Sequence, residues 1–105
     1  MKELEILKSI LASNFQYSFY DEAIINIRME IIELPYYKDN WNDVMRFILY
    51  RKFSDGDSLK LIHDSANLVL FDNTEEEAYR WLDLFLVNVV NGDKDIIPYQ
   101  TETKT

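Results

Sequence analysis

The scarcity of glycine and proline constrains this chain more than any other feature of its sequence. Among 105 residues there are only 2 Gly and 2 Pro. Sandwiches and barrels need many turn residues, so this composition disfavours them and favours helices joined by short polar connections. Hydrophobic residues make up 48% of the chain, enough for one substantial core. We therefore predict an all-α fold, a compact bundle of about five helices.

Leucine and isoleucine recur at helical spacing in the N-terminal part of the chain, and they predict helices over about residues 2–13 and 19–33. Ser18 and Asp21 resemble a capping box for the second helix, and Pro35 ends it. Apolar side chains cover most of this second helix and leave only a narrow polar stripe. We therefore expect it to lie at the centre of the bundle.

The middle of the chain predicts two further helices, over about residues 40–52 and 58–67. Asp39 or Asn40 can cap the first of them, and Asp57 can cap the second. The turn between them contains one of the two glycines, which supports a break in the helical pattern at this point.

The apolar run at residues 68–71 lacks periodicity and is too short for a helix, so we predict a buried extended connector. Thr74 and Glu77 then form a capping box for a fifth helix, over about residues 75–91. Residues 84–90 have the composition of a strand. The strong cap and the continuous pattern before them favour a helix, although a strand remains an alternative.

The chain is predicted to form one helical domain, residues 1–98, followed by a flexible tail, residues 99–105. The absence of cysteine excludes disulfides and thiol chemistry and fits a reducing compartment. The N-terminal segment does not resemble a secretory signal, and no apolar run approaches the about 20 residues of a membrane span. We therefore expect a cytoplasmic protein that does not bind membranes.

Acidic residues dominate the charge of the chain, whose formal net charge is -8. The excess is concentrated in residues 53–105, where eleven acidic residues face four basic ones. Such a surface repels nucleic acid and anionic membranes and attracts basic partners. We therefore expect a protein partner rather than nucleic acid.

The sequence lacks the residue patterns that catalysis, metal binding and phosphate binding require. The only histidine, His63, is followed by Asp64, but neighbours in a helix point to different faces. No nucleophile motif, EF-hand loop or glycine-rich phosphate loop is present. We therefore predict no catalytic, cofactor-binding or metal-binding residues, and no enzymatic activity.

An acidic cluster surrounds the start of the fifth predicted helix, where Asp72, Glu75, Glu76 and Glu77 fall within about one turn and Asp64 is expected nearby. Three glutamates in a first turn stabilise a helix N-terminus, and this role alone explains them. The same cluster also suits a docking patch for a basic partner. Both explanations remain open at the level of sequence.

Aromatic residues are concentrated beside the end of the second predicted helix, where Tyr36, Tyr37 and Trp41 lie in or near a loop. Tyrosine and tryptophan are enriched at interface hot spots, so these residues are candidate anchors for a partner. Alternatively, Trp41 and one tyrosine fill the core between two helices, while the other tyrosine faces outward.

Residues 36–44 and 73–82, together with the size, acidity and helical composition, resemble bacterial immunity proteins. These are encoded beside the toxins of contact-dependent growth inhibition and bacteriocin systems. The resemblance implies tight binding of a cognate toxin C-terminal domain, with a basic nuclease as the expected toxin. The alternative is an acidic helical adaptor or regulatory protein that acts through protein–protein contacts.

Overall fold

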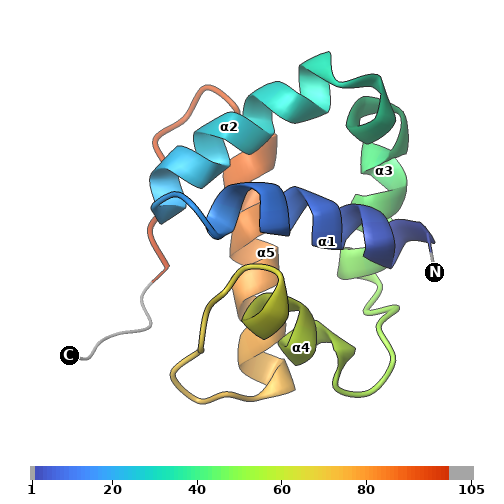
Figure 1. Ribbon diagram of the computed structural model, residues 1–105, viewed down its shortest axis with the longest axis vertical. Coiled ribbons are helices and arrows are strands. Elements are labelled where there is room, and N and C mark those ends of the chain that lie inside the picture. Colours follow the sequence, from blue (N-terminus) through green and yellow to red (C-terminus); the bar gives the residue numbers. More distant parts are fainter. Residues whose placement is uncertain (1, 100–105) are drawn as a thin grey trace.

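A computed structural model describes residues 2–99, and within them the chain folds into α-helices and contains no strand. The all-α bundle predicted from the sequence is confirmed. α5 stands at the centre of the bundle and contacts α2, α3 and α4, while α1 crosses in front of it (Figure 1). The helices are α1 (Lys2–Phe15), α2 (Tyr20–Glu33), α3 (Pro35–Leu49), α4 (Asp57–Asp64) and α5 (Glu75–Val90).

Aromatic rings from three helices form the middle of the core. Trp81 and Phe85 of α5 stack with their ring centroids 5.7 Å apart. Phe15 of α1 packs edge-on against Trp81 at 5.2 Å, and Trp41 of α3 meets Phe85 at 6.4 Å. Residues 84–90 belong to α5, so the prediction of a helix there is confirmed. A central helix is surrounded by apolar neighbours on most sides, which explains its strand-like composition.

Pro35 ends α2 and is also the first residue of α3. The prediction that the third helix begins near residue 40, with a cap at Asp39 or Asn40, is wrong. Proline suits the first helical position because its fixed φ is helical and its missing N–H needs no partner there. Leu34 joins the two helices: its N–H donates to the Glu30 carbonyl, and its own carbonyl accepts from the Lys38 N–H, both at 2.9 Å.

The start of α2 also differs from the prediction, by one residue. Phe19, not Ser18, occupies the position before the helix, and its backbone N–H donates to Glu22 Oε1 at 3.2 Å. The reciprocal glutamate of a capping box is therefore Glu22 rather than Asp21. The longer glutamate side chain reaches back over the first turn.

Residues with left-handed backbone conformations lie before and after α4. Gly56 has φ of 83° and precedes the helix, which begins at Asp57, one residue earlier than predicted. The helix ends at Asp64 rather than near residue 67. Asn67 has φ of 58°, a conformation that the short side chain of asparagine tolerates, and there the chain turns away.

The connector at residues 68–71 is not helical, as predicted, but only part of it is buried. Leu70 is buried, whereas Val69 and Phe71 are exposed. Successive side chains of an extended backbone point to opposite sides, so a single connector on the surface cannot bury all of them. The prediction of a buried connector is therefore wrong for Val69 and Phe71.

The C-terminal segment, defined here as residues 91–99, is fastened along α5 by two side chains. Asn88 exchanges two hydrogen bonds with the backbone of Ile97, at 2.9 and 2.8 Å. Arg28 of α2 donates to carbonyl groups at the end of α5 and within the segment. In Figure 1 the segment returns along the left side of α5 in red. It therefore has defined contacts although its sequence shows no periodic pattern.

Tyr99, which the sequence assigns to a flexible tail of residues 99–105, packs against the core. Its hydroxyl donates a hydrogen bond of 3.0 Å to Glu77 Oε2 on α5. The rest of that predicted tail, residues 100–105, lies outside the described residues. The domain therefore includes Tyr99.

Candidate protein-binding surfaces

Glu77, a member of the predicted acidic docking patch, is buried, with 3% of its surface exposed. Its Oε1 accepts a hydrogen bond of 2.5 Å from the backbone N–H of Asp72, and its Oε2 accepts the hydroxyl of Tyr99. Thr74 caps α5 as predicted, because its Oγ1 accepts the Glu77 N–H at 3.2 Å. Glu77 therefore joins three segments of the fold, and a partner cannot reach its carboxylate.

The other acidic residues of this turn are also engaged within the protein. Glu75 Oε2 accepts the backbone N–H of Gly56 at 2.6 Å, which ties α5 to the loop before α4. Asp72 and Glu76 are exposed and lie on either side of Arg80, at 3.6 and 3.9 Å. These two are the most exposed carboxylates of the turn, Glu75 is partly exposed, and Asp72 and Glu76 share one cation. Most of the acidic cluster therefore has contacts within the fold.

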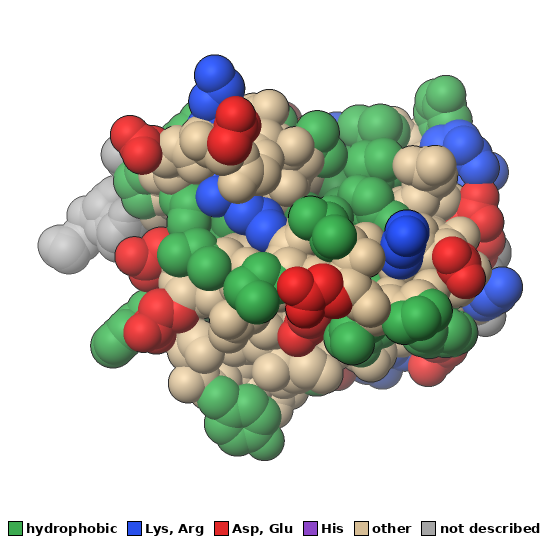
Figure 2. Space-filling view, turned by 90° about the horizontal axis from the view of Figure 1, so that it is seen from above, with side chains coloured by type: hydrophobic (Ala, Val, Ile, Leu, Met, Phe, Trp, Pro, Cys, Tyr) green, Lys and Arg blue, Asp and Glu red, His purple; other side chains and the backbone are tan. Residues whose placement is uncertain are grey.

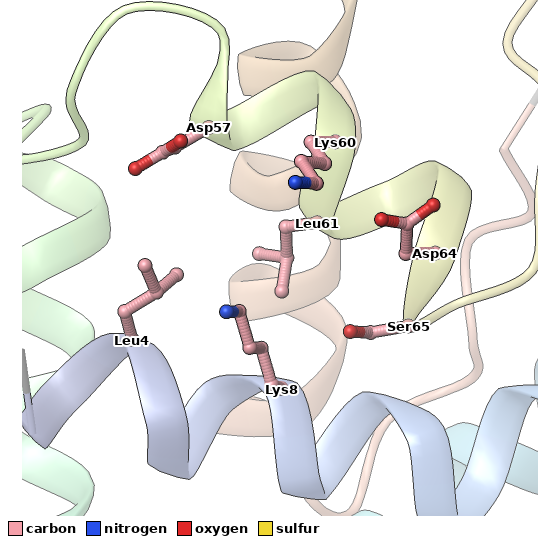
Figure 3. A pocket seen from close by; sticks show the side chains of 7 residues that line it. All are labelled: Leu4, Lys8, Asp57, Lys60, Leu61, Asp64 and Ser65. Carbon is pink, nitrogen blue, oxygen red and sulfur yellow. The ribbon is translucent and has the colours of Figure 1, made fainter.

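Asp64 lies apart from this cluster. Glu75 contacts the residues at the N-terminal end of α4, whereas Asp64 is the last residue of that helix, about 12 Å away along its axis. Asp64 lines a cavity of about 210 Å³ between α1 and α4, into which the amino groups of Lys8 and Lys60 point (Figure 3). Its carboxylate lies 3.0 Å from Nδ1 of His63, in an exposed pair.

The cavity between α1 and α4 has a lining that does not favour one type of charge. Two lysines are balanced by two aspartates, Asp57 and Asp64, and the remaining lining residues are Leu4, Leu61 and Ser65. A site for an anion or a cation needs an excess of the opposite charge. The cavity therefore provides no candidate site for an anion or a cation.

The three predicted aromatic anchors have different environments. Trp41 is only 8% exposed and belongs to the core. Tyr37 is partly buried, and its hydroxyl shares a hydrogen bond of 2.8 Å with Ser9 Oγ, which ties α3 to α1. Tyr36 is exposed, with its ring 6.0 Å from that of Tyr37. One tyrosine thus faces inward and one outward, and Tyr36 alone of the three is available to a partner.

A further candidate surface, which the sequence patterns did not predict, is a row of exposed apolar side chains on α2. Ile25, Met29 and Ile32, called here the α2 outer row, are 49%, 52% and 68% exposed. The core-facing side of the same helix carries Ile24 and Ile27, which are fully buried. The expectation that α2 lies at the centre of the bundle is therefore wrong. Its narrow polar stripe was the signal, because a helix at the surface with so few polar residues must expose apolar ones.

Acidic residues border the α2 outer row. Glu22 and Glu33 on α2 are exposed, and within residues 2–99 neither of them forms an ion pair. Leu34 and Tyr36 continue the exposed apolar surface beyond the end of α2. Figure 2 looks down on the side where α2 lies in Figure 1 and shows hydrophobic, acidic and basic side chains interspersed across it. Exposed aromatic and aliphatic groups beside unpaired carboxylates are the chemistry expected of a surface that binds a basic protein.

A second apolar area is a groove of about 360 Å³ between α3 and α5. Arg46, next to Met45 of its lining, is already paired with Asp43. None of the residues that line the groove is acidic, so the groove is less suited to a basic partner than the α2 outer row. It is lined by Met45, Leu49, Leu86, Val87, Val90 and Asn91.

Among the described residues, no group of three or more histidine, aspartate or glutamate side chains is arranged to hold a metal ion. None of the helices in the same part of the chain has the length and apolar character to cross a membrane. No family model, curated protein or solved structure matches the chain.

Proposed function

We propose that this protein is an immunity protein that binds and neutralises a basic toxin domain, with a nuclease as the toxin. The observation that carries the proposal is the exposed apolar surface of α2 and Tyr36 beside carboxylates that have no internal cation. The net charge of -8 supports it, because it favours a basic partner over nucleic acid. In this proposal the protein is cytoplasmic, needs no cofactor and performs no catalysis.

Each part of this surface supplies a different step of binding. Unpaired carboxylates speed the encounter with a basic domain, and this effect weakens as salt screens the charges. Exposed aromatic and aliphatic side chains slow dissociation once they are enclosed, because their burial removes apolar area from water. A nuclease groove must be basic to bind phosphate, so an acidic protein that occupies it prevents substrate binding.

An adaptor or regulatory role is the alternative, and the same apolar surface favours it equally. The two roles differ in the partner and in the affinity. An immunity protein must keep an active toxin inhibited at low concentration, so its dissociation constant is expected to be about 1 nM or lower. Regulatory contacts that must reverse bind more weakly.

The proposal predicts that a neighbouring gene encodes a toxin C-terminal domain, and co-expression with that domain tests the proposal. We expect a stable complex on co-purification, protection of cells from the toxin, and loss of its nuclease activity when the purified proteins are mixed. A toxin domain that stays fully active in the presence of excess protein would refute the immunity function. An adaptor would then be the better description.

A further inference from the structure

The geometry of α2 separates its two apolar faces. Ile25, Met29 and Ile32 follow each other at spacings of four and three residues, which places them on one face of a helix. Ile27, on the opposite face, is fully buried against the core. Once a helix has buried one apolar face, a second apolar face that stays exposed does not add to the stability of the isolated fold. The α2 outer row therefore needs an explanation outside the isolated domain.

One flank of the α2 outer row is acidic and open. Glu33 follows Glu22 by eleven residues, close to three helical turns, so both carboxylates lie on the same flank, about 16 Å apart along the axis. Asn26 lies between them on that flank and is also exposed. Neither glutamate forms an ion pair within residues 2–99. A partner can therefore place cations along this flank without displacing an existing one.

The other flank of the row is closed by the C-terminal segment. Arg28 lies on this flank, and its guanidinium donates to the carbonyls of Asn88, Gly92 and Lys94 at 2.9, 3.4 and 3.0 Å. These hydrogen bonds hold the C-terminal segment beside α2 and use the donors of Arg28. The two flanks therefore differ: one offers two carboxylates without a cation, although Glu22 also accepts the Phe19 N–H, and the other lies beside the backbone of the C-terminal segment.

We infer that the basic partner docks on the α2 outer row with its cations on the Glu22–Glu33 flank. The occupant is a basic protein domain because the open flank is acidic and unpaired. A second copy of this chain would bring the same glutamates toward each other, which disfavours self-association. This inference rests on the proposed function and deepens it, because it names the face and the orientation of the partner.

The test measures binding of the catalytically inactivated toxin C-terminal domain encoded by the neighbouring gene. Met29→Asp is expected to weaken the dissociation constant by about 100-fold, because it places a charge in the middle of the apolar contact. The double variant Glu22→Lys with Glu33→Lys is expected to slow association by about tenfold at low salt and to remove most of its salt dependence. All three positions are exposed, but Glu22 also accepts the Phe19 N–H at the start of α2, so thermal unfolding is measured for each variant to show that it remains folded.

The matched control is Asp72→Lys with Glu76→Lys, which changes the net charge equally at the exposed carboxylates of the acidic cluster. Its dissociation constant is expected to stay within about threefold of the wild-type value. A control that slows association as much as the α2 double variant would overturn the inference. Wild-type affinity in Met29→Asp would overturn it as well.

Two further outcomes separate this inference from the function on which it rests. If the wild-type protein does not bind the toxin domain, the proposed function fails and the inference fails with it. If the wild-type protein binds and all α2 variants bind equally well, only the docking face is wrong. If sedimentation shows a wild-type dimer that Met29→Asp converts to a monomer, a second copy covers the row and the inference is overturned.

Discussion

The first turn of α5 and the outer row of α2 have the opposite environments from those that their compositions indicate: the charged turn makes contacts within the fold, and the apolar row is exposed. The turn of α5 carries three consecutive glutamates, yet one is buried, one holds a loop, and the third shares Arg80 with Asp72. The segment of α2 is rich in isoleucine, yet the three side chains of its outer row are about half exposed or more. Carboxylates make contacts within the fold at the first turn of α5, whereas apolar side chains are exposed to solvent on α2.

This contrast shows that residue type alone does not identify a binding surface. A carboxylate is available to a partner only if it stays exposed and has no cation within the fold, and burial or an internal ion pair removes it from a partner's reach. An apolar side chain belongs to the core only if another element covers it. Tertiary packing decides which groups remain free. Substitutions at the two sites test this, because they should change the free energy of unfolding by different amounts.

The largest effect is expected at Glu77. Glu77→Ala leaves the Asp72 N–H and the Tyr99 hydroxyl without their acceptor, so the free energy of unfolding should fall by about 3 kcal/mol. Urea denaturation followed by circular dichroism measures this change. Its neighbour Glu76 is the control, because its side chain is 87% exposed and Glu76→Ala should leave stability nearly unchanged. Equal effects of the two substitutions would remove the structural role assigned to Glu77.

The second prediction concerns the hydrogen bond from Tyr99 to Glu77. Burial, together with this bond and the charge of the glutamate, raises the pKa of Tyr99 from 10.0 to about 12. The folded state therefore holds the phenolic proton more tightly than the unfolded chain does. The resulting stabilisation is fully present below pH 10 and is lost as the pH rises through about 12.

Tyr99→Phe removes both the bond and this titration. Near neutral pH it should lower the free energy of unfolding by about 1.5 kcal/mol. Between pH 9 and pH 11.5 the stability of the wild-type protein should fall more steeply than that of the variant. Burial also raises the pKa of Tyr20, which both proteins retain, so only the difference between the two slopes reports on Tyr99. Parallel slopes would contradict the assignment.

Local patterns in the sequence were sufficient to predict the helices and one cap correctly. Apolar periodicity located all five, and Thr74 followed by Glu77 marked the start of α5. The beginning of α3 was missed because Pro35 was interpreted only as a stop for the preceding helix, although proline also suits the first position of the next.

The candidate site was less predictable because it depends on contacts between distant residues. The partner of Glu77 is Tyr99, which lies in a segment without a periodic pattern, so its burial leaves no local signal. On α2, the sequence shows apolar residues on both faces. It does not show that α1, α3 and α5 together cover one face and leave the other open.

The third prediction sharpens the role of the α5 turn as a structural cap. Thr74→Ala removes the acceptor for the Glu77 N–H and should lower the free energy of unfolding by about 1 kcal/mol. Thr74→Ser retains a hydroxyl at the same position and should stay close to wild type. If alanine and serine destabilise equally, the loss comes from the methyl group of threonine and not from the cap.

The smallest effect is expected at Met29, where Met29→Ser should change the free energy of unfolding by less than about 0.5 kcal/mol. The side chain is half exposed, so removing it opens no cavity. Ile27→Ala on the opposite face of the same helix should instead cost about 3 kcal/mol, since that side chain is fully buried. If Met29→Ser costs as much as Ile27→Ala, the outer row is already covered in the isolated protein. The contrast between α2 and the α5 turn would then disappear.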